Sequence, residues 1–264
     1  RFPIMKKLFA ILMALVMVLS LMTVSAETAT DKQYVLDKGT LVVGITDFAP
    51  MDYKDADGNW IGFDADVAKL FAEYLGVKVE FVEIDWDNKI LELDAKAVDC
   101  IWNGMTLTDA VKNAMETSNP YMNNAQVVVV PADQADKYQT VESLAALTFA
   151  VEAGSAGEAV ITDLGLNCTP VTAQADALME VAAFTSDAAV IDALMAAAMI
   201  GEGTNYANLT YTIGLNSEEY GVGFRKGSDL AAELNGFLVK LYAEGKLQEI
   251  AETYKVQAAL IAQE

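Results

Sequence analysis

Five short segments of the sequence carry the residues that could do chemistry. They contain the aromatic rings of Phe48, Tyr53 and Trp86, together with glycines, hydroxyl groups and acids. Such a set of residues is suited to binding a small organic molecule, because rings pack on its apolar part while backbone amides, hydroxyls and carboxylates bind its polar groups. The segments are residues 46–53, 84–87, 103–108 and 152–157 and Asp192.

Histidine is absent from all 264 residues. Its absence removes Ser–His and Cys–His nucleophile pairs, His-bearing zinc sites and most proton shuttles. No pair of carboxylates has a spacing that singles it out for acid–base work. We therefore expect no catalytic residue, no metal site and no cofactor, and we expect that the protein is not an enzyme.

The composition is strongly acidic, with 38 Asp and Glu against 17 Lys and Arg and a formal net charge of −21. Such a surface repels phosphate backbones and anionic lipid, so nucleic acid is not an expected partner. The 53% of apolar residues can bury a substantial core in one or two domains.

Residues 1–26 are predicted to be a signal peptide with a few upstream residues. They hold a basic start at residues 5–7, an apolar run at residues 8–19 and small residues at 24–26. A membrane anchor is the alternative, but Ser20 ends the run before it reaches the roughly 18 residues that a span needs. No cysteine follows the run to carry a lipid, so we expect a periplasmic or secreted protein. Cys100 in a strand and Cys168 in a distant loop are expected to be buried free thiols.

Strands and helices must position the five segments that carry the candidate binding residues. Strand patterns at residues 41–45, 77–81 and 98–102, with a helix at 62–76, indicate the β-α-β rhythm of a parallel sheet. A second series begins at residue 126, and a long amphipathic helix follows at 228–244. Ligands bind such sheets at the carboxyl ends of the strands, where all five segments lie. The second series has strands at 127–130, 148–151, 188–191 and 220–224 and helices at 156–164 and 175–183.

Several motifs, in order, resemble the amino-acid-binding (family 3) solute-binding proteins of ABC importers. GITDFAPMDY and GFDADVAKLFAEYLGVKVEFVE are similar to the first lobe, SNPYMNNAQVVVV to the first hinge crossing, and SLAALTFAVEAGSAGEAV to the start of the second lobe. The resemblance implies a type II periplasmic-binding fold, with two lobes of mostly parallel sheet and flanking helices joined by a two-strand hinge. Lobe one would be residues 27–125 and 223–264, and lobe two residues 126–222.

The resemblance also implies roles for particular residues. Phe48 and Trp86 would sandwich the ligand side chain. Gly104 would present a carbonyl to its amino group, and Thr106 would donate to its carboxylate. Ser155 and the following amides would bind the carboxylate, and Asp192 would pair with the ammonium; Asp47 is a further candidate for ligand contact.

Each of these residues also has a purely structural interpretation. Phe48 could cap the core, and Asp47 could lie on the surface or beside the hinge. Thr106, Ser155 and Asp192 could serve only as helix caps. Trp86 stands between two aspartates, which is an unlikely setting for deep burial.

Position 111 departs from the family pattern. Family members usually place an arginine there, whose planar fork holds the ligand carboxylate, but this sequence has Val111. Lys112 is adjacent, yet one residue along a helix turns a side chain by about 100°. Either other donors compensate or the ligand lacks a free carboxylate. Because Asp47, Asp52 and Asp192 have no arginine nearby, we expect a cationic or amine-bearing ligand.

The resemblance implies a non-catalytic protein that delivers an amino acid or related small amine-bearing solute to the membrane permease subunits of an ABC importer by hinge closure. We expect a monomer. Two alternatives share the fold. One is an enzyme similar to cyclohexadienyl dehydratases, and the other is a sensory ligand-binding domain, which would need additional transmembrane or catalytic sequence.

Overall fold

The computed structural model describes residues 30–264, so the predicted signal peptide at residues 1–26 lies outside the described residues. The described chain is an α/β fold with two main sheets and one short hairpin, β2 (Tyr53–Lys54) and β3 (Trp60–Ile61). This confirms the predicted fold class. No helix among residues 30–264 is long and apolar enough to cross a membrane.

The first sheet contains β1 (Thr40–Ile45), β4 (Lys78–Glu83), β5 (Cys100–Thr106), β6 (Met115–Thr117), β7 (Met122–Asn124) and β13 (Glu218–Arg225). Its order is β4-β1-β5-β13-β6, and β7 also pairs with β13. β1 is parallel to β4 and β5, whereas β13 is antiparallel to β5, β6 and β7. One direction therefore dominates the sheet, as expected, and β13 alone is reversed.

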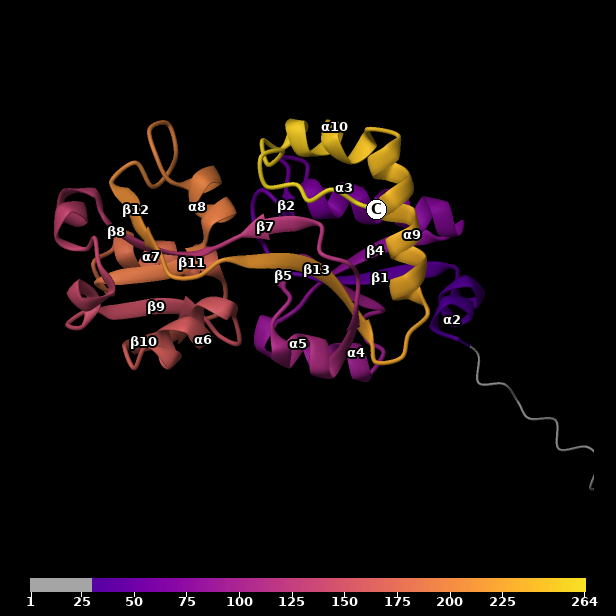
Figure 1. The fold of residues 1–264 in the computed structure, drawn as a ribbon, viewed down its shortest axis with the longest axis horizontal. Helices are drawn as coiled ribbons and strands as arrows, with labels where there is room; N and C mark the ends of the chain where they lie inside the picture. The colour runs from indigo at the N-terminus through magenta and orange to yellow at the C-terminus, as the bar shows by residue number, and fades with distance from the viewer. Residues whose placement is uncertain (1–29) are drawn as a thin grey trace, which may run out of the picture. The chain divides into compact units, whose positions relative to one another are not determined.

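Helices cover both faces of the first sheet. Figure 1 shows α3 (Phe63–Leu75), α9 (Leu230–Ala243) and α10 (Lys246–Thr253) on one side of it and α4 (Lys89–Asp94) and α5 (Asp109–Ala114) on the other. The short helix α2 (Asp31–Lys38) precedes β1. α3 matches the predicted helix, since Gly62 precedes it and Gly76 ends it in the left-handed conformation with φ 75°. Tyr74 stands at the helical spacing of the buried residues Val67 and Phe71, but it is exposed and its hydroxyl donates to Glu233.

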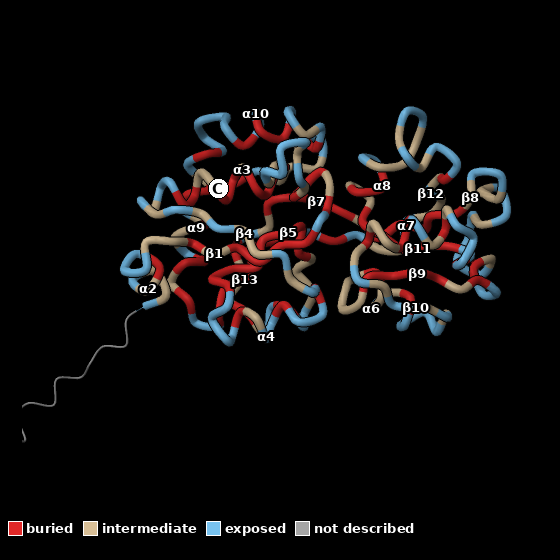
Figure 2. The backbone as a smooth tube through the Cα atoms, turned by 180° about the vertical axis from the view of Figure 1, so that it is seen from behind, coloured by how far each residue is buried: buried red, intermediate tan, exposed pale blue. Residues whose placement is uncertain are grey.

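The second sheet contains β8 (Gln126–Pro131), β9 (Thr148–Glu152), β10 (Asn167–Val171), β11 (Ala188–Asp192) and β12 (Leu209–Gly214), in the order β10-β9-β11-β8-β12. β9 is parallel to β10 and β11, and β8 alone is reversed. Helices α6 (Ala156–Asp163), α7 (Gln174–Ala182) and α8 (Ala193–Met199) pack on it. Figure 2 shows the buried segments following β5, β9 and β11 through the two sheets.

The chain passes between the two sheets twice. It leaves β7 and enters β8 at residues 124–126, and it leaves β12 and enters β13 at residues 214–218. β7 and β13 pair side by side through Glu218 and Asn124 (Figure 1). The sequence placed the second crossing at 222–223, but β13 belongs to the first sheet over its whole length. The division into two lobes with a hinge stays a proposal.

Both cysteines are free, as the sequence predicted. Cys100 is fully buried in β5, whereas Cys168 is only partly buried. Cys168 lies in β10 and not in a loop, because Asn167–Val171 pairs in parallel with β9 despite containing Pro170.

Candidate functional site

A cavity of about 240 Å³ lies where residues from both sheets converge. A cavity of this size can hold a small organic molecule. Six of the seven residues that the sequence singled out line it, namely Phe48, Trp86, Gly104, Thr106, Ser155 and Asp192. Each lies near or shortly after the carboxyl end of a strand, namely β1, β4 or β5 of the first sheet or β9 or β11 of the second, so the fold brings them together as the carboxyl-end rule predicts.

Asp47 does not line the cavity. Its side chain is exposed, whereas the neighbouring Phe48 is buried and faces the cavity. Asp52 is also absent from the lining; it is completely buried, and its backbone carbonyl accepts from the N–H of Phe48. Of the three aspartates that suggested a cationic ligand, only Asp192 can therefore contact one in this geometry.

Phe48 and Gly104 fit closely against each other. A Cβ on Gly104 would lie 2.3 Å from Cε1 of Phe48, and Gly104 has φ 55°, so only glycine is accommodated there. Its N–H donates to Oδ2 of Asp64 at 2.6 Å, which also accepts from the hydroxyl of Tyr121. Burial raises the pKa of Asp64. This buried acid fixes the backbone that forms one wall of the cavity.

Trp86 is 7% exposed and packs with Leu93, Met105 and Val111 in one hydrophobic cluster. Its flanking aspartates do not keep it at the surface, and it is the buried first residue of the short helix Trp86–Asn88. Val111 lines the cavity and is nearly buried, while Lys112 is exposed and does not line it. No arginine is present among the residues that line the cavity.

Thr106 lies in the wall, but its hydroxyl donates to Oε1 of Glu218 at 2.9 Å. Helix capping was the structural alternative for Thr106, but Thr108 makes the cap, because its Oγ1 accepts from the N–H of Val111. Ser155 does cap α6, since its Oγ accepts from the N–H of Glu158 at 3.1 Å. Ser155 therefore both caps α6 and lines the cavity.

Asp192 precedes α8 but makes no capping hydrogen bond. Instead its carboxylate accepts from the side chains of Asn124, Gln126, Gln174 and Tyr220. Three of these donors meet at Oδ1, so Oδ2, which accepts only from Gln174, retains capacity for a ligand. Burial raises the pKa of Asp192, and the nearby charge of Glu218 raises it further.

Glu152 is a second buried acid in the cavity; it begins the segment at residues 152–157 but was not itself a predicted binding residue. It is 3% exposed, and its Oε1 has no hydrogen-bond partner. Burial and the charge of Asp192 raise the pKa of Glu152 to about 8, against the opposing influence of Lys89. Glu152 ends β9 as Asp192 ends the adjacent β11, so the rule that found Asp192 could also have found it.

Lys89 is the one cationic side chain among the described residues that line the cavity. Its Nζ donates to the carbonyl oxygens of Trp86 at 3.1 Å and Gly154 at 2.8 Å, and it lies 4.8 Å from the centre of the Trp86 ring. Burial lowers the pKa of Lys89. No sequence signal pointed to it, because a lysine at the start of a short helix usually faces solvent.

The raised pKa values predict how the stability of the ligand-free protein depends on pH. Between about pH 4.5 and 8 the folded state retains protons on Glu152 that the unfolded chain has lost, so stability falls as pH rises through this window. Asp192 and Asp64 act in the same direction. Each unit of pKa difference is worth about 1.4 kcal/mol, so urea unfolding should show a loss of several kcal/mol from about pH 5 to about pH 8.

The matched variant for this experiment is Glu152→Gln, which removes one titrating group without changing the shape of the side chain. Its stability should fall less steeply over the same window. Acids with a lowered pKa, such as Glu233, titrate below the window and do not interfere. Stability that stays constant or increases toward pH 8 in the parent protein would contradict the assignment.

The two sheets, the paired crossing strands and the cavity lined from both sheets define a binding protein of the type II periplasmic-binding kind. The sequence profile of bacterial extracellular solute-binding proteins, family 3, matches residues 41–257. The chain belongs to this family.

Individual relatives agree with this assignment. The arginine-binding extracellular protein ArtP of Bacillus subtilis is 26% identical over 224 residues, which cover 82% of this chain and 86% of ArtP. The crystal structure of a mutant of ArgBP from T. maritima superposes with a TM-score of 0.80 at 32% identity and covers 85% of this chain and 99% of that one.

A match to an enzyme is shorter. Cyclohexadienyl dehydratase of Pseudomonas aeruginosa is 27% identical over 111 residues, which cover 42% of this chain and 41% of the enzyme. The longer matches are therefore to proteins named for amino-acid binding.

Proposed function

We propose that this protein captures an amino acid or a related small amine-bearing solute outside the cytoplasm and delivers it to the permease subunits of an ABC importer. Capture takes place in the cavity between the two sheets, and the lobes close on the ligand about the β7–β8 and β12–β13 crossings. The protein performs no chemistry on the ligand. Family membership and the names of ArtP and ArgBP support the ligand class.

The observation that carries the proposal is the charge of the cavity lining. Two buried acids, Glu152 and Asp192, and one buried ammonium, Lys89, line the cavity, and no arginine does. Burial favours the protonated form of the acids in the ligand-free protein, and a cationic group of a ligand would stabilise their ionised form. Burying an unpaired charge is costly, so the lining favours a ligand whose cationic group pairs with an acid. An anionic ligand such as L-glutamate would place a further negative charge beside them.

The test is a thermal-shift panel of matched pairs that differ only in the carboxylate. L-Arginine is compared with agmatine, L-lysine with cadaverine and L-histidine with histamine, and L-glutamate is the anionic control. A ligand that binds only the folded state raises the melting temperature, by an increment that corresponds to about 2.7 kcal/mol at 100 times its Kd. We expect at least one cationic member to raise it and L-glutamate to leave it unchanged.

A melting temperature raised by L-glutamate alone, or raised by no compound of the panel, would contradict the preference for a cationic ligand that the cavity lining supports. The non-catalytic part of the proposal is checked separately. NMR of a prolonged incubation should show the bound compound and a prephenate-like acid unaltered, whereas elimination of water from the acid would favour the dehydratase alternative.

A further inference from the structure

The ammonium group of Lys89 is incompletely paired although the side chain is buried. Lys89 is 8% exposed, and the carbonyls of Trp86 and Gly154 account for two of its three hydrogens. Nζ makes no third hydrogen bond and no ion pair among residues 30–264, and its remaining contact is with the ring of Trp86, 4.8 Å from the ring centre. A buried ammonium in this state retains the capacity to bind an anionic group of a ligand.

Further unpaired donors lie next to the carbonyl that Lys89 contacts. Gly154 is followed by Ser155 and the first turn of α6, and the N–H groups of Ala156 and Gly157 donate to no acceptor in the described part of the chain. Gly154, Ser155 and Ala156 line the same cavity as Lys89. The ammonium and the start of the helix therefore offer donors at one corner of the cavity.

An unpaired acid lies in the same cavity. Oε1 of Glu152 is buried without a partner, and the structure shows no ion pair between Glu152 and Lys89. A buried cation and a buried acid that do not pair with each other form a receptor for a ligand that carries both charges, because the cationic group of the ligand stabilises the ionised form of the acid. A ligand with a carboxylate and an amine or guanidinium satisfies both residues at once.

We infer that Lys89 binds the carboxylate of the ligand, together with the first amides of α6, and so takes the role of the arginine that is replaced by Val111. Lys89 is then the residue that makes the site prefer an amino acid over the amine that lacks its carboxylate. This inference rests on the proposed function and assigns a specificity role within that site.

The test combines two ligands with three proteins in titration calorimetry. The parent protein, Lys89→Met and Lys89→Arg are each titrated with L-arginine and with agmatine. The loss of a charge-assisted contact should lower the affinity of Lys89→Met for L-arginine by at least about tenfold. Its affinity for agmatine should stay unchanged or rise, because the variant removes a positive charge from the cavity. Lys89→Arg keeps the charge and should retain the preference for L-arginine.

The ratio of the two affinities separates this role from a structural one. Lys89 also joins Trp86 to Gly154, and losing that contact would weaken both ligands by the same factor. An equal loss for both ligands, or an unchanged ratio, overturns the inference while leaving the proposed function intact. If the parent protein binds neither ligand nor the lysine and histidine pairs, the proposed function fails and the inference fails with it. Thermal unfolding of each variant verifies that it is folded.

Discussion

Asp192→Asn is expected to weaken the binding of L-arginine roughly 100-fold, which corresponds to about 3 kcal/mol. The substitution removes a buried charge from the cavity wall and places an amide N–H₂ near the donor group of Gln174. The oxygen of the new amide can still accept from Asn124, Gln126 and Tyr220, so the fold should survive. Titration calorimetry at about pH 8, where the acid is most ionised, measures the change.

The matched control is Asp47→Asn, because the same chemical change is made at an exposed acid outside the cavity. Its affinity for L-arginine should equal that of the parent within about twofold, as for other surface substitutions. Equal losses in the two variants would mean that net charge, and not a contact in the cavity, determines binding. An Asp192→Asn variant with the affinity of the parent would remove Asp192 from the site.

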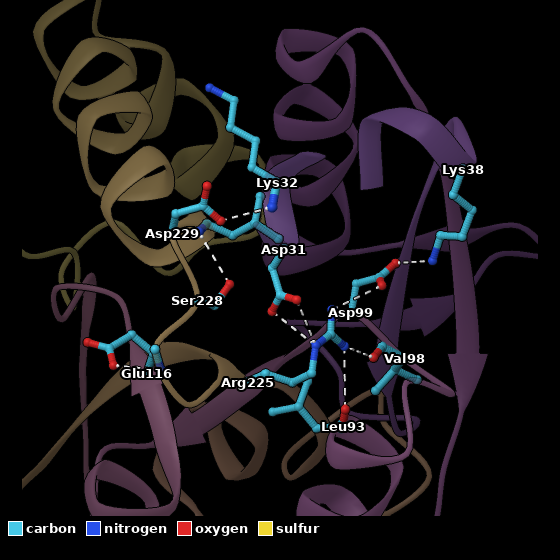
Figure 3. Close-up of polar contacts among 12 residues, drawn as sticks. Asp31, Lys32, Lys38, Leu93, Val98, Asp99, Glu116, Arg225, Ser228 and Asp229 are labelled. Carbon is cyan, nitrogen blue, oxygen red and sulfur yellow. Dashed lines mark hydrogen bonds and ion pairs between the residues drawn. The ribbon is translucent and has the colours of Figure 1, made fainter. Parts of the chain in front are cut away.

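The second large effect concerns stability. Arg225 is the one arginine among the described residues, and Figure 3 shows it joining α2, β13 and the chain between α4 and β5. Its Nε donates to both carboxylate oxygens of Asp31 at 3.0 and 3.1 Å, and Nη1 donates to the carbonyl of Val98 at 2.8 Å. Nη2 lies 3.5 Å from Oδ1 of Asp99, which is completely buried.

Arg225→Ala should therefore reduce the free energy of unfolding by about 3 kcal/mol, because it leaves the buried charge of Asp99 with Lys38 as its remaining cationic partner. For a chain of this size that corresponds to a decrease in melting temperature of roughly 10 °C. Arg225→Lys keeps the charge but loses the planar fork, so its decrease should be smaller. Calorimetry in the absence of ligand measures both.

The control for this experiment is Lys246→Ala. It also removes one positive charge, but from an exposed pair with Glu249 on α10, which is expected to contribute less than about 1 kcal/mol. If Arg225→Ala and Lys246→Ala unfolded at the same temperature, the Arg225 contacts would have no net stabilising effect.

Much of the fold could be predicted because apolar periodicity marks each buried face. The helix at residues 62–76 and the strand at residues 98–102 stand out in this way, since their apolar side chains recur at helical spacing or form a continuous run. Tyr74 is the informative exception. Its position matches the spacing of the buried residues of the helix, but its hydroxyl donates to Glu233 at the surface. Spacing alone cannot distinguish a ring buried in the core from a ring that lies at the edge of the core.

The cavity could be predicted where its residues follow strands. Trp86, Gly104 and Asp192 were found by that rule, but the rule cannot say which of two neighbours faces inward. Asp47 and Phe48 adjoin in one loop, and only Phe48 lines the cavity. Lys89 and Gln174 lie on helices, where polar residues ordinarily face solvent, so only the folded chain shows that they reach the cavity.

The most direct test of the binding role is titration of L-arginine into the parent protein and into the double variant Glu152→Gln, Asp192→Asn. The parent should bind one L-arginine per chain with saturable heat, and the double variant should bind it at least about 100-fold more weakly, because both acids of the cavity are gone. Equal binding by the two proteins would contradict a cation-binding cavity between the sheets, and so would no binding by the parent of any amino acid or amine.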